Sequence, residues 1–125
     1  MAENTKFELS TKHRDEAEVI YLKGFLDAHT APQLEAALDE QIKNGNYRII
    51  VNFADLEYIS SAGLGVFMAF IETVRDKGGD IKLCSMKKSV YSVFDLLGFP
   101  LLFDISDDEE TALKNFEKTE NKENQ

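Results

Sequence analysis

Near its start the chain has two short stretches, 6–13 and 17–24, whose residues are typical of β-strands, joined by three polar residues. A short polar connection between two such stretches predicts a hairpin. The stretch 47–53 contains three consecutive β-branched apolar residues, as expected for a strand that is covered on both faces. Shorter apolar stretches at 80–85 and 100–106 predict two further strands.

Between these strands the apolar residues recur every three or four positions, which is typical of amphipathic helices. The pattern predicts four helices, over 31–43, over 62–77, over 87–98 and after Ser106. Two of them are preceded by capping-box patterns, Thr30 with Gln33 and Ser106 with Glu109. Helices that alternate with strands after an initial hairpin predict an α/β domain with a mixed sheet of four or five strands and about four flanking helices.

The length of 125 residues fits one domain with a single core. We expect residues 1–117 to form this domain and the polar residues 118–125 to be a frayed tail. The lone cysteine, Cys84, lies in an apolar strand and is expected to be a buried, reduced thiol.

The formal net charge of −9 argues against nucleic acid as a partner, and no basic patch offsets it. A protein partner with a basic surface is the better match. The N-terminal residues lack the pattern of a signal peptide, and the longest apolar run, Ile59 to Ile71, is too short to span a bilayer. The sequence therefore predicts a cytoplasmic protein without membrane insertion.

The stretch "YISSAGLGVF", residues 58–67, sets two serines at the start of the second helix, followed by Gly63 and Gly65. Either Ser60 or Ser61 can act as the N-cap. Each glycine within a helix costs about 1 kcal/mol relative to alanine. We interpret both glycines as leaving backbone that a partner can approach closely. The same helix end favours a phosphate on the serine, because free N–H groups and the helix dipole point toward it.

The second helix is apolar on two sides. At 100° per residue, its sheet-facing side is predicted to carry Leu64, Phe67, Met68, Ile71 and Val74. Val66 and Phe70 fall on nearly the opposite side, where a surface helix normally carries charges. Either a neighbouring helix covers these two side chains, or they form an exposed apolar patch on which a partner docks.

Three segments, "LKGFLDAHTAPQLEAAL", "IIVNFADLEYISSAGLGVFMAF" and "SVFDLLGF", together resemble a stand-alone STAS domain of the bacterial anti-sigma factor antagonist family. The match runs from about Val19 to Phe103. The resemblance implies the STAS-like sheet and helices, no catalytic activity and no cofactor. It also implies partner switching. The unmodified protein binds a serine kinase of histidine-kinase-like ATPase fold that doubles as an anti-sigma factor. The kinase phosphorylates one serine, which breaks the complex, and a metal-dependent serine phosphatase resets it.

Carried over by position, the phosphorylated serine falls on Ser61. Family members commonly have aspartate just before it, and here that position is Ser60, the alternative phosphorylation site. Asp27 matches an aspartate near the kinase-facing loop, although a turn residue before a helix explains it nearly as well. Asn52 and Asp55 match positions around the phosphorylation loop, where loop hydrogen bonding is the simpler interpretation. The expected partner-binding set is Asp27, Ser60, Ser61, Ala62, Gly63, Gly65, Val66 and Phe70.

Two other functions fit the sequence less well. A serine hydrolase is disfavoured because Ile59 replaces the first glycine of the nucleophile elbow and both histidines precede the serines. No phosphate-binding loop of the G-x-x-x-x-G-K-[ST] type is present either. Alternatively, the domain is a small STAS subunit of a transporter or sensory complex, but a constitutive subunit does not need a phosphorylatable serine at a helix start.

Overall fold

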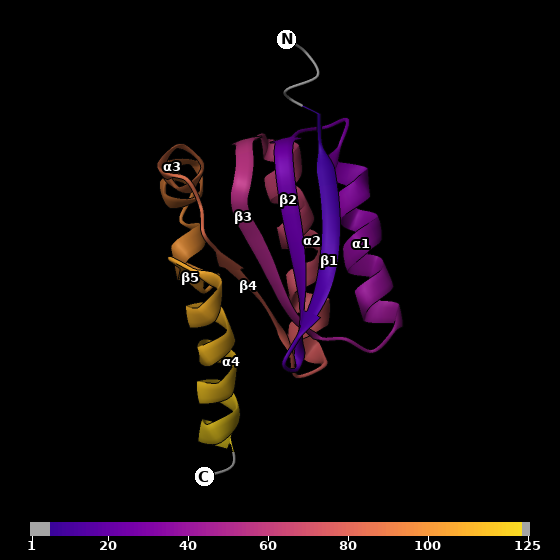
Figure 1. Ribbon diagram of the computed structural model, residues 1–125, viewed down its shortest axis with the longest axis vertical. Helices are drawn as coiled ribbons and strands as arrows, with labels where there is room; N and C mark the ends of the chain where they lie inside the picture. Colours follow the sequence, from indigo (N-terminus) through magenta and orange to yellow (C-terminus); the bar gives the residue numbers. More distant parts are fainter. Residues whose placement is uncertain (1–5, 124–125) are drawn as a thin grey trace.

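The computed structural model describes the backbone of residues 6–123 and the side chains of residues 6–117. Strands and helices alternate after an initial hairpin, as the sequence predicts (Figure 1). The elements are β1 (Glu8–Arg14), β2 (Ala17–Leu26), α1 (Ala31–Lys43), β3 (Arg48–Ile59), α2 (Ser61–Asp76), β4 (Asp80–Cys84), α3 (Lys88–Leu96), the short 3-10 helix η2 (Phe99–Leu101), β5 (Ile105–Ser106) and α4 (Glu109–Glu123).

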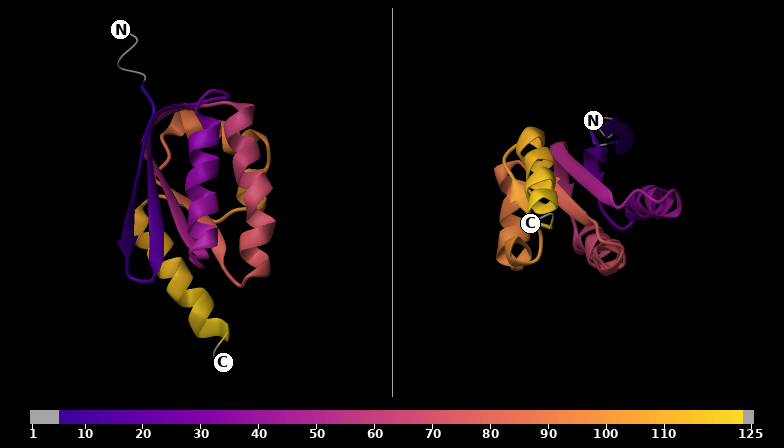
Figure 2. Two further views of the ribbon diagram at one scale, coloured as in Figure 1. Left: turned by 90° about the vertical axis from the view of Figure 1, so that its right-hand side faces the viewer. Right: turned by 90° about the horizontal axis from the view of Figure 1, so that it is seen from below.

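The sheet has five strands in the order β1-β2-β3-β4-β5. The hairpin strands β1 and β2 are antiparallel, and every later neighbour pair is parallel. The predicted mixed sheet is thereby confirmed. Because α1, α2 and α3 each connect neighbouring parallel strands in one direction, right-handed crossovers bring them to the same face of the sheet. Figure 2 shows α1 and α2 side by side on that face.

Two hydrophobic clusters lie on the two faces of the sheet. The larger cluster joins the strands to Leu34 and Leu38 of α1, Phe67 of α2 and Phe94 of α3. The smaller cluster packs α4 against the opposite face and contains Ala17, Val19, Ile50, Cys84, Ala112, Leu113 and Phe116. The middle of β3 is therefore covered on both sides, as its sequence predicts. The predicted burial of Cys84 is also confirmed, and this burial raises the pKa of its thiol to about 11.

Two strands differ in length from the prediction. β3 continues to Ile59 instead of ending near residue 53, because Tyr58 and Ile59 pair with the end of β2 beyond two irregularities that break the alternation. The last strand is only two residues long. The preceding residues form η2, since Gly98 takes a left-handed conformation (φ 78°) and Pro100 has no N–H to offer a strand ladder.

The last helix differs from the prediction at both ends. Asp108 Oδ1 accepts a hydrogen bond from Thr111 N at 2.8 Å, so Asp108 caps α4, whereas Ser106 lies in β5. That hydrogen bond holds the pKa of Asp108 below its usual value. The helical backbone continues to Glu123, so the domain boundary predicted at residue 117 is not where the helix ends. Residues 124 and 125 of the predicted tail lie outside the described residues.

The first turn of α2 is pressed against the ends of β2 and β3. Gly63 is buried, and a Cβ atom at this position would lie 2.8 Å from Leu26 Cγ and 2.9 Å from Ile59 Cγ1. The interpretation of Gly63 as backbone open to a partner is therefore wrong. Gly63 is needed for the internal contact. Gly65 is exposed, with nothing within 4 Å of its Cβ position, and fits the open interpretation.

The N-terminal end of α4 is tied to the sheet through the carboxylate of Glu109. This carboxylate accepts hydrogen bonds from Arg14 (2.5 Å), Asn52 (2.9 Å) and Tyr21 (3.0 Å). Asn52 thus lies within β3 and contacts α4, and its Oδ1 also accepts a hydrogen bond from Ala54 N. Burial alone would raise the pKa of Glu109, but the three hydrogen bonds outweigh it and leave that pKa below its usual value.

None of the helices within residues 6–123 has the length and the apolar character needed to cross a membrane.

We predict opposite effects for alanine at the two glycines of α2. Gly63→Ala should lower the free energy of unfolding by about 1–2 kcal/mol, because the added methyl overpacks the contact with Leu26 and Ile59. Gly65→Ala should raise it by up to about 1 kcal/mol, since alanine is the better helix former at an open position. Urea denaturation followed by circular dichroism measures both. Equal stability of the two variants would show that the Gly63 contact is not tight.

We also predict that Glu109→Gln loses about 1–2 kcal/mol of stability at pH 7, because hydrogen bonds to a charged carboxylate are lost. A carboxyl whose pKa is lowered on folding stabilises the fold above its ordinary pKa of 4.5, and this contribution is lost as the pH falls through the lower, folded-state value. Denaturation at pH 7 and pH 3 should therefore show a difference between wild type and variant that shrinks in acid. Glu117→Gln is the matched control, because Glu117 is an exposed carboxylate on the same helix and lies outside this hydrogen-bond network. A pH-independent difference would contradict the electrostatic origin.

Candidate functional site

The helix α2 begins where β2 and β3 end, at the carboxyl edge of the parallel strands (Figure 1). Ser60 has an extended backbone, and its N–H donates to the carbonyl of Leu26 at the end of β2 (2.9 Å). The carbonyl of Ser60 in turn accepts from Leu64 N (3.1 Å). These two bonds fix the direction in which α2 leaves the sheet, and with it the positions of both serines.

The two serines have different environments. Ser61 is the first helical residue and is exposed. Ser60, one of the two serines predicted as N-cap, occupies that position, but its hydroxyl makes no hydrogen bond to the helix, so the predicted side-chain cap is wrong. Its Oγ is buried and has no hydrogen-bond partner among the described residues. Only one of the two hydroxyls is therefore accessible from outside the molecule.

The start of α2 is electrostatically suited to an anion. The first N–H groups of a helix have no partner within it, and the dipole of a 16-residue helix places partial positive charge there. No acidic side chain lies in the first turn of α2. A negative group on Ser61 would therefore be stabilised by the helix end itself.

One face of α2, which we call the α2 face, is free of the core and consists of Ser61, Gly65, Met68 and Ala69. Ser61, Gly65 and Met68 follow the spacing of a single helix side. Met68 is 47% exposed, so its predicted place against the sheet is wrong. The sequence pattern did not indicate this exposure, because methionine is an apolar residue that often fills gaps in cores.

The other apolar side of α2 packs against α1. Val66 is 3% exposed, and Phe70 is half-buried against the core. Val66 is therefore ruled out as a docking residue, whereas Phe70 is only partly covered, and its contact with a partner stays a prediction. Ala62 is also half-buried against the core. The buried side of α2 thus includes Val66 and leaves Met68 outside.

Asp27 organises the loop between β2 and α1. Its Oδ1 accepts hydrogen bonds from His29 N (2.9 Å) and Thr30 N (3.2 Å), which is an Asx turn. The Thr30 hydroxyl donates to Phe25 O and accepts from Asp27 N, so it closes this loop and makes no side-chain cap on α1. The turn interpretation of Asp27 is confirmed, and a partner contact remains a prediction.

An aromatic side chain that the sequence analysis did not single out lies near the end of β3. Tyr58 is 48% exposed, and its ring packs on Phe25 of β2 with centroids 5.4 Å apart. The adjacent Glu57 pairs with Lys87, just before α3, at 2.8 Å. The sequence would have indicated Tyr58 only if β3 had been predicted to continue to Ile59, and the pattern of residues placed its end near residue 53.

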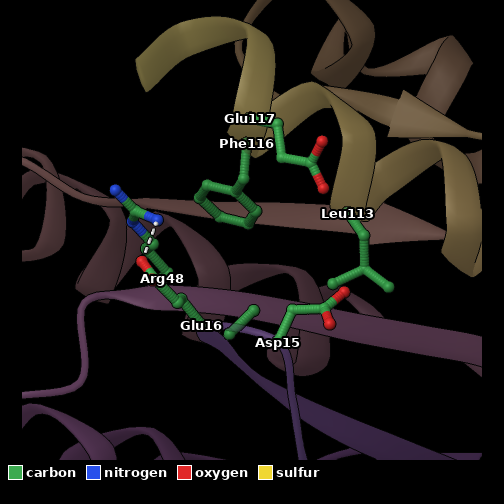
Figure 3. Close-up of a pocket in the computed structure, with 7 residues that line it drawn as sticks. Asp15, Glu16, Arg48, Leu113, Phe116 and Glu117 are labelled. Carbon is green, nitrogen blue, oxygen red and sulfur yellow. Dashed lines mark hydrogen bonds and ion pairs between the residues drawn. The ribbon is translucent and has the colours of Figure 1, made fainter. Parts of the chain in front are cut away.

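A pocket of about 270 Å³ lies at the opposite end of the sheet, between the β1–β2 turn and α4. Figure 3 shows Leu113 and Phe116 of α4 above this turn and the ion pair of Arg48 with Glu16 (3.1 Å). Since Arg48 begins β3 and Ser61 follows its end, the pocket is separate from the start of α2. In the part of the chain that is described, no cluster of three His, Cys, Asp or Glu side chains is arranged to hold a metal ion.

Comparison with known proteins matches residues 8–112 to the STAS domain family. BtrV of Bordetella bronchiseptica, described as a candidate anti-sigma factor antagonist, is 36% identical over 95 residues, 76% of this chain and 82% of BtrV. The anti-sigma-B factor antagonist of Bacillus subtilis is 32% identical over 88 residues, 70% of this chain and 79% of that protein.

Among solved structures, the Bacillus cell fate determinant SpoIIAA in its phosphorylated form superimposes with a TM-score of 0.67 at 27% identity. The superposition covers 89% of this chain and 99% of SpoIIAA. The family match spans most of the chain, and the five-stranded sheet with four α-helices agrees with it. The chain therefore belongs to the STAS domain family.

Proposed function

We propose that this chain is an anti-sigma factor antagonist that works by partner switching. In its unmodified form it binds an anti-sigma serine kinase of histidine-kinase-like ATPase fold through the start of α2. Phosphorylation of Ser61 breaks this complex, and a metal-dependent serine phosphatase restores the binding form. The relatives named as anti-sigma factor antagonists support the role, and the solved structure of SpoIIAA in its phosphorylated form supports a phosphorylated state of such a domain.

The observation that carries this proposal is the contrast between the two serines. Ser61 is exposed at the first position of α2, whereas Ser60 Oγ is buried. A kinase must bring the γ-phosphate of ATP into line with the attacking oxygen, so it needs a hydroxyl that reaches its own active site. This contrast favours Ser61 over Ser60. Ser60 is the alternative because it offers a second hydroxyl where family members commonly carry aspartate.

The transfer step requires little of this domain beyond presenting the hydroxyl. Ser61 Oγ forms a bond to the γ-phosphorus of ATP, the bond from that phosphorus to the β–γ bridging oxygen breaks, and ADP leaves. The hydroxyl proton passes to a base of the kinase. The exposed, side-chain-free Gly65 lies one turn away and leaves room for the kinase to approach.

The phosphate is expected to break the complex without unfolding the domain. At the start of a helix it gains about 0.3–1 kcal/mol from the dipole, so the free domain tolerates it. It also adds about −1.5 to −2 charges at the N-terminal end of the α2 face. A partner whose surface is complementary to a neutral serine would have to bury this charge without pairing it, which weakens binding.

We predict that the kinase and ATP add one phosphate to the wild-type chain, located on Ser61 by mass spectrometry. Ser61→Ala should take up none. Ser60→Ala is the matched control and should still be phosphorylated, because its hydroxyl is buried in the folded domain. Phosphate found on Ser60 in the wild type would move the switch by one residue.

We predict that Ser61→Asp binds the kinase more than tenfold more weakly than wild type, a loss of about 1.4 kcal/mol. Asparagine has nearly the same shape as aspartate but no charge, so the affinity of Ser61→Asn for the kinase should stay within a fewfold of wild type. Calorimetric titration of each variant into the purified kinase separates charge from size. Equal binding by Ser61→Asp and wild type would contradict the electrostatic switch, and a membrane transporter in place of a kinase in pull-downs would contradict the proposed role.

A further inference from the structure

Four leucines at the end of α3 and around η2 lie on the protein surface. Leu101 and Leu96 are 91% and 84% exposed, Leu97 is 57% exposed and Leu102 is 47% exposed. They fall within residues 96–102, which we call the leucine segment. Single exposed leucines are common, but four on one short segment mark an interaction site.

The leucine segment is held in place from below by aromatic rings. Phe99 packs edge-on against Phe94 with ring centroids 5.2 Å apart, and it stacks on Phe103 at 5.5 Å. Phe103 in turn contacts Phe67 of α2 at 6.4 Å. All four phenylalanines are buried. The phenylalanines therefore anchor the segment in the core, and the leucines between them remain outside.

The backbone of the leucine segment is also fixed. Gly98 O accepts from Leu101 N at 3.1 Å, and Phe99 O accepts from Leu102 N at 2.9 Å. Leu102 O accepts from Arg75 Nη2 of α2 at 2.6 Å. A surface ordered in this way loses little conformational entropy on binding, which favours its use as a docking site.

The leucine segment is continuous with the α2 face. Ser61, Met68 and Arg75 follow one another at intervals of seven residues, so they lie on one side of α2 over about 21 Å. The guanidinium of Arg75 lies over the Phe103 ring, 5.7 Å from its centroid. Figure 2 (right) shows α2 between α1 and α3. A partner docked at Ser61 with an interface of ordinary size reaches the leucine segment.

The charges around the leucine segment indicate what kind of partner covers it. Glu72, Asp76 and Asp95 are exposed on α2 and α3. A second copy of this chain would bring the same acidic surface and another net charge of −9. A partner with basic residues around an apolar groove avoids this repulsion and associates faster.

We propose that the leucine segment is the second half of the surface that binds the kinase, an inference that rests on the proposed function. Its leucines enter an apolar groove of the kinase that is rimmed by basic side chains. Leu102, at the end of the segment, bonds Arg75 about 21 Å along the helix from Ser61, and at that distance the charge of a phosphate on Ser61 is largely screened. The leucine segment therefore contributes the same factor to binding in both states of Ser61.

The test is the double substitution Leu96→Ser with Leu101→Ser, made in the full chain with and without Ser61→Asp. Both leucines are more than four-fifths exposed, so the melting temperature should not change. Calorimetric titration into the purified kinase should show binding at least tenfold weaker, by a similar factor in both backgrounds. Ala36→Ser, an exposed apolar-to-polar change on α1, is the matched control and should bind as wild type does.

Each other outcome overturns the inference in a recognisable way. Wild-type affinity of the double variant, with weak binding by Ser61→Asp, rejects the leucine segment and keeps the proposed function. Weaker binding in only one Ser61 background rejects the independence of the two halves. A wild-type dimer in analytical ultracentrifugation that the double variant converts to monomer assigns the segment to self-association. If neither substitution changes kinase binding, the proposed function fails as well.

Discussion

The close approach of α2 to the ends of β2 and β3 decides what this domain can present to a partner. The contact is possible because Gly63 has no side chain where Leu26 and Ile59 converge. Together with the hydrogen bond from Ser60 N to Leu26 O, it fixes both the position and the rotation of the helix. One hydroxyl is therefore buried and the next is exposed. A shift in this contact would change the accessibility of both serines together.

The two faces of the sheet are covered by different helices and differ in what they expose. One face is closed by α4, which is held by the smaller hydrophobic cluster and by the hydrogen bonds to Glu109. The other carries α1, α2 and α3, where, among the residues whose side chains are described, an exposed serine, an exposed methionine and exposed leucines occur on neighbouring elements. The recognition surface therefore lies on the same face as the larger hydrophobic cluster, and it is supported by the buried side chains of α1, α2 and α3.

Periodicity along the chain predicted the order and type of the elements well, because each buried stripe is a local pattern. It failed where structure depends on neighbours. The irregular pairing of β2 with β3 hid the end of β3, and η2 follows from the conformation of Gly98. Ser61 as the site came from the family resemblance. Three features of α2 depend on the elements packed around it, and the residue pattern of one helix does not contain that information. They are the exposure of Met68, the burial of Val66 and the contact of Gly63 with the strand ends.

The position of Ser61 makes the proposed switch efficient for an energetic reason. A phosphate that strained the free domain would destabilise the domain itself as well as the complex. At the start of α2 the helix dipole stabilises it in the free domain, so the charge acts chiefly against the complex. If the leucine segment binds independently of Ser61, its share of the affinity cannot be removed by phosphorylation. That share must therefore be too small to hold the complex alone, which makes the α2 face the part that decides whether the partner stays bound.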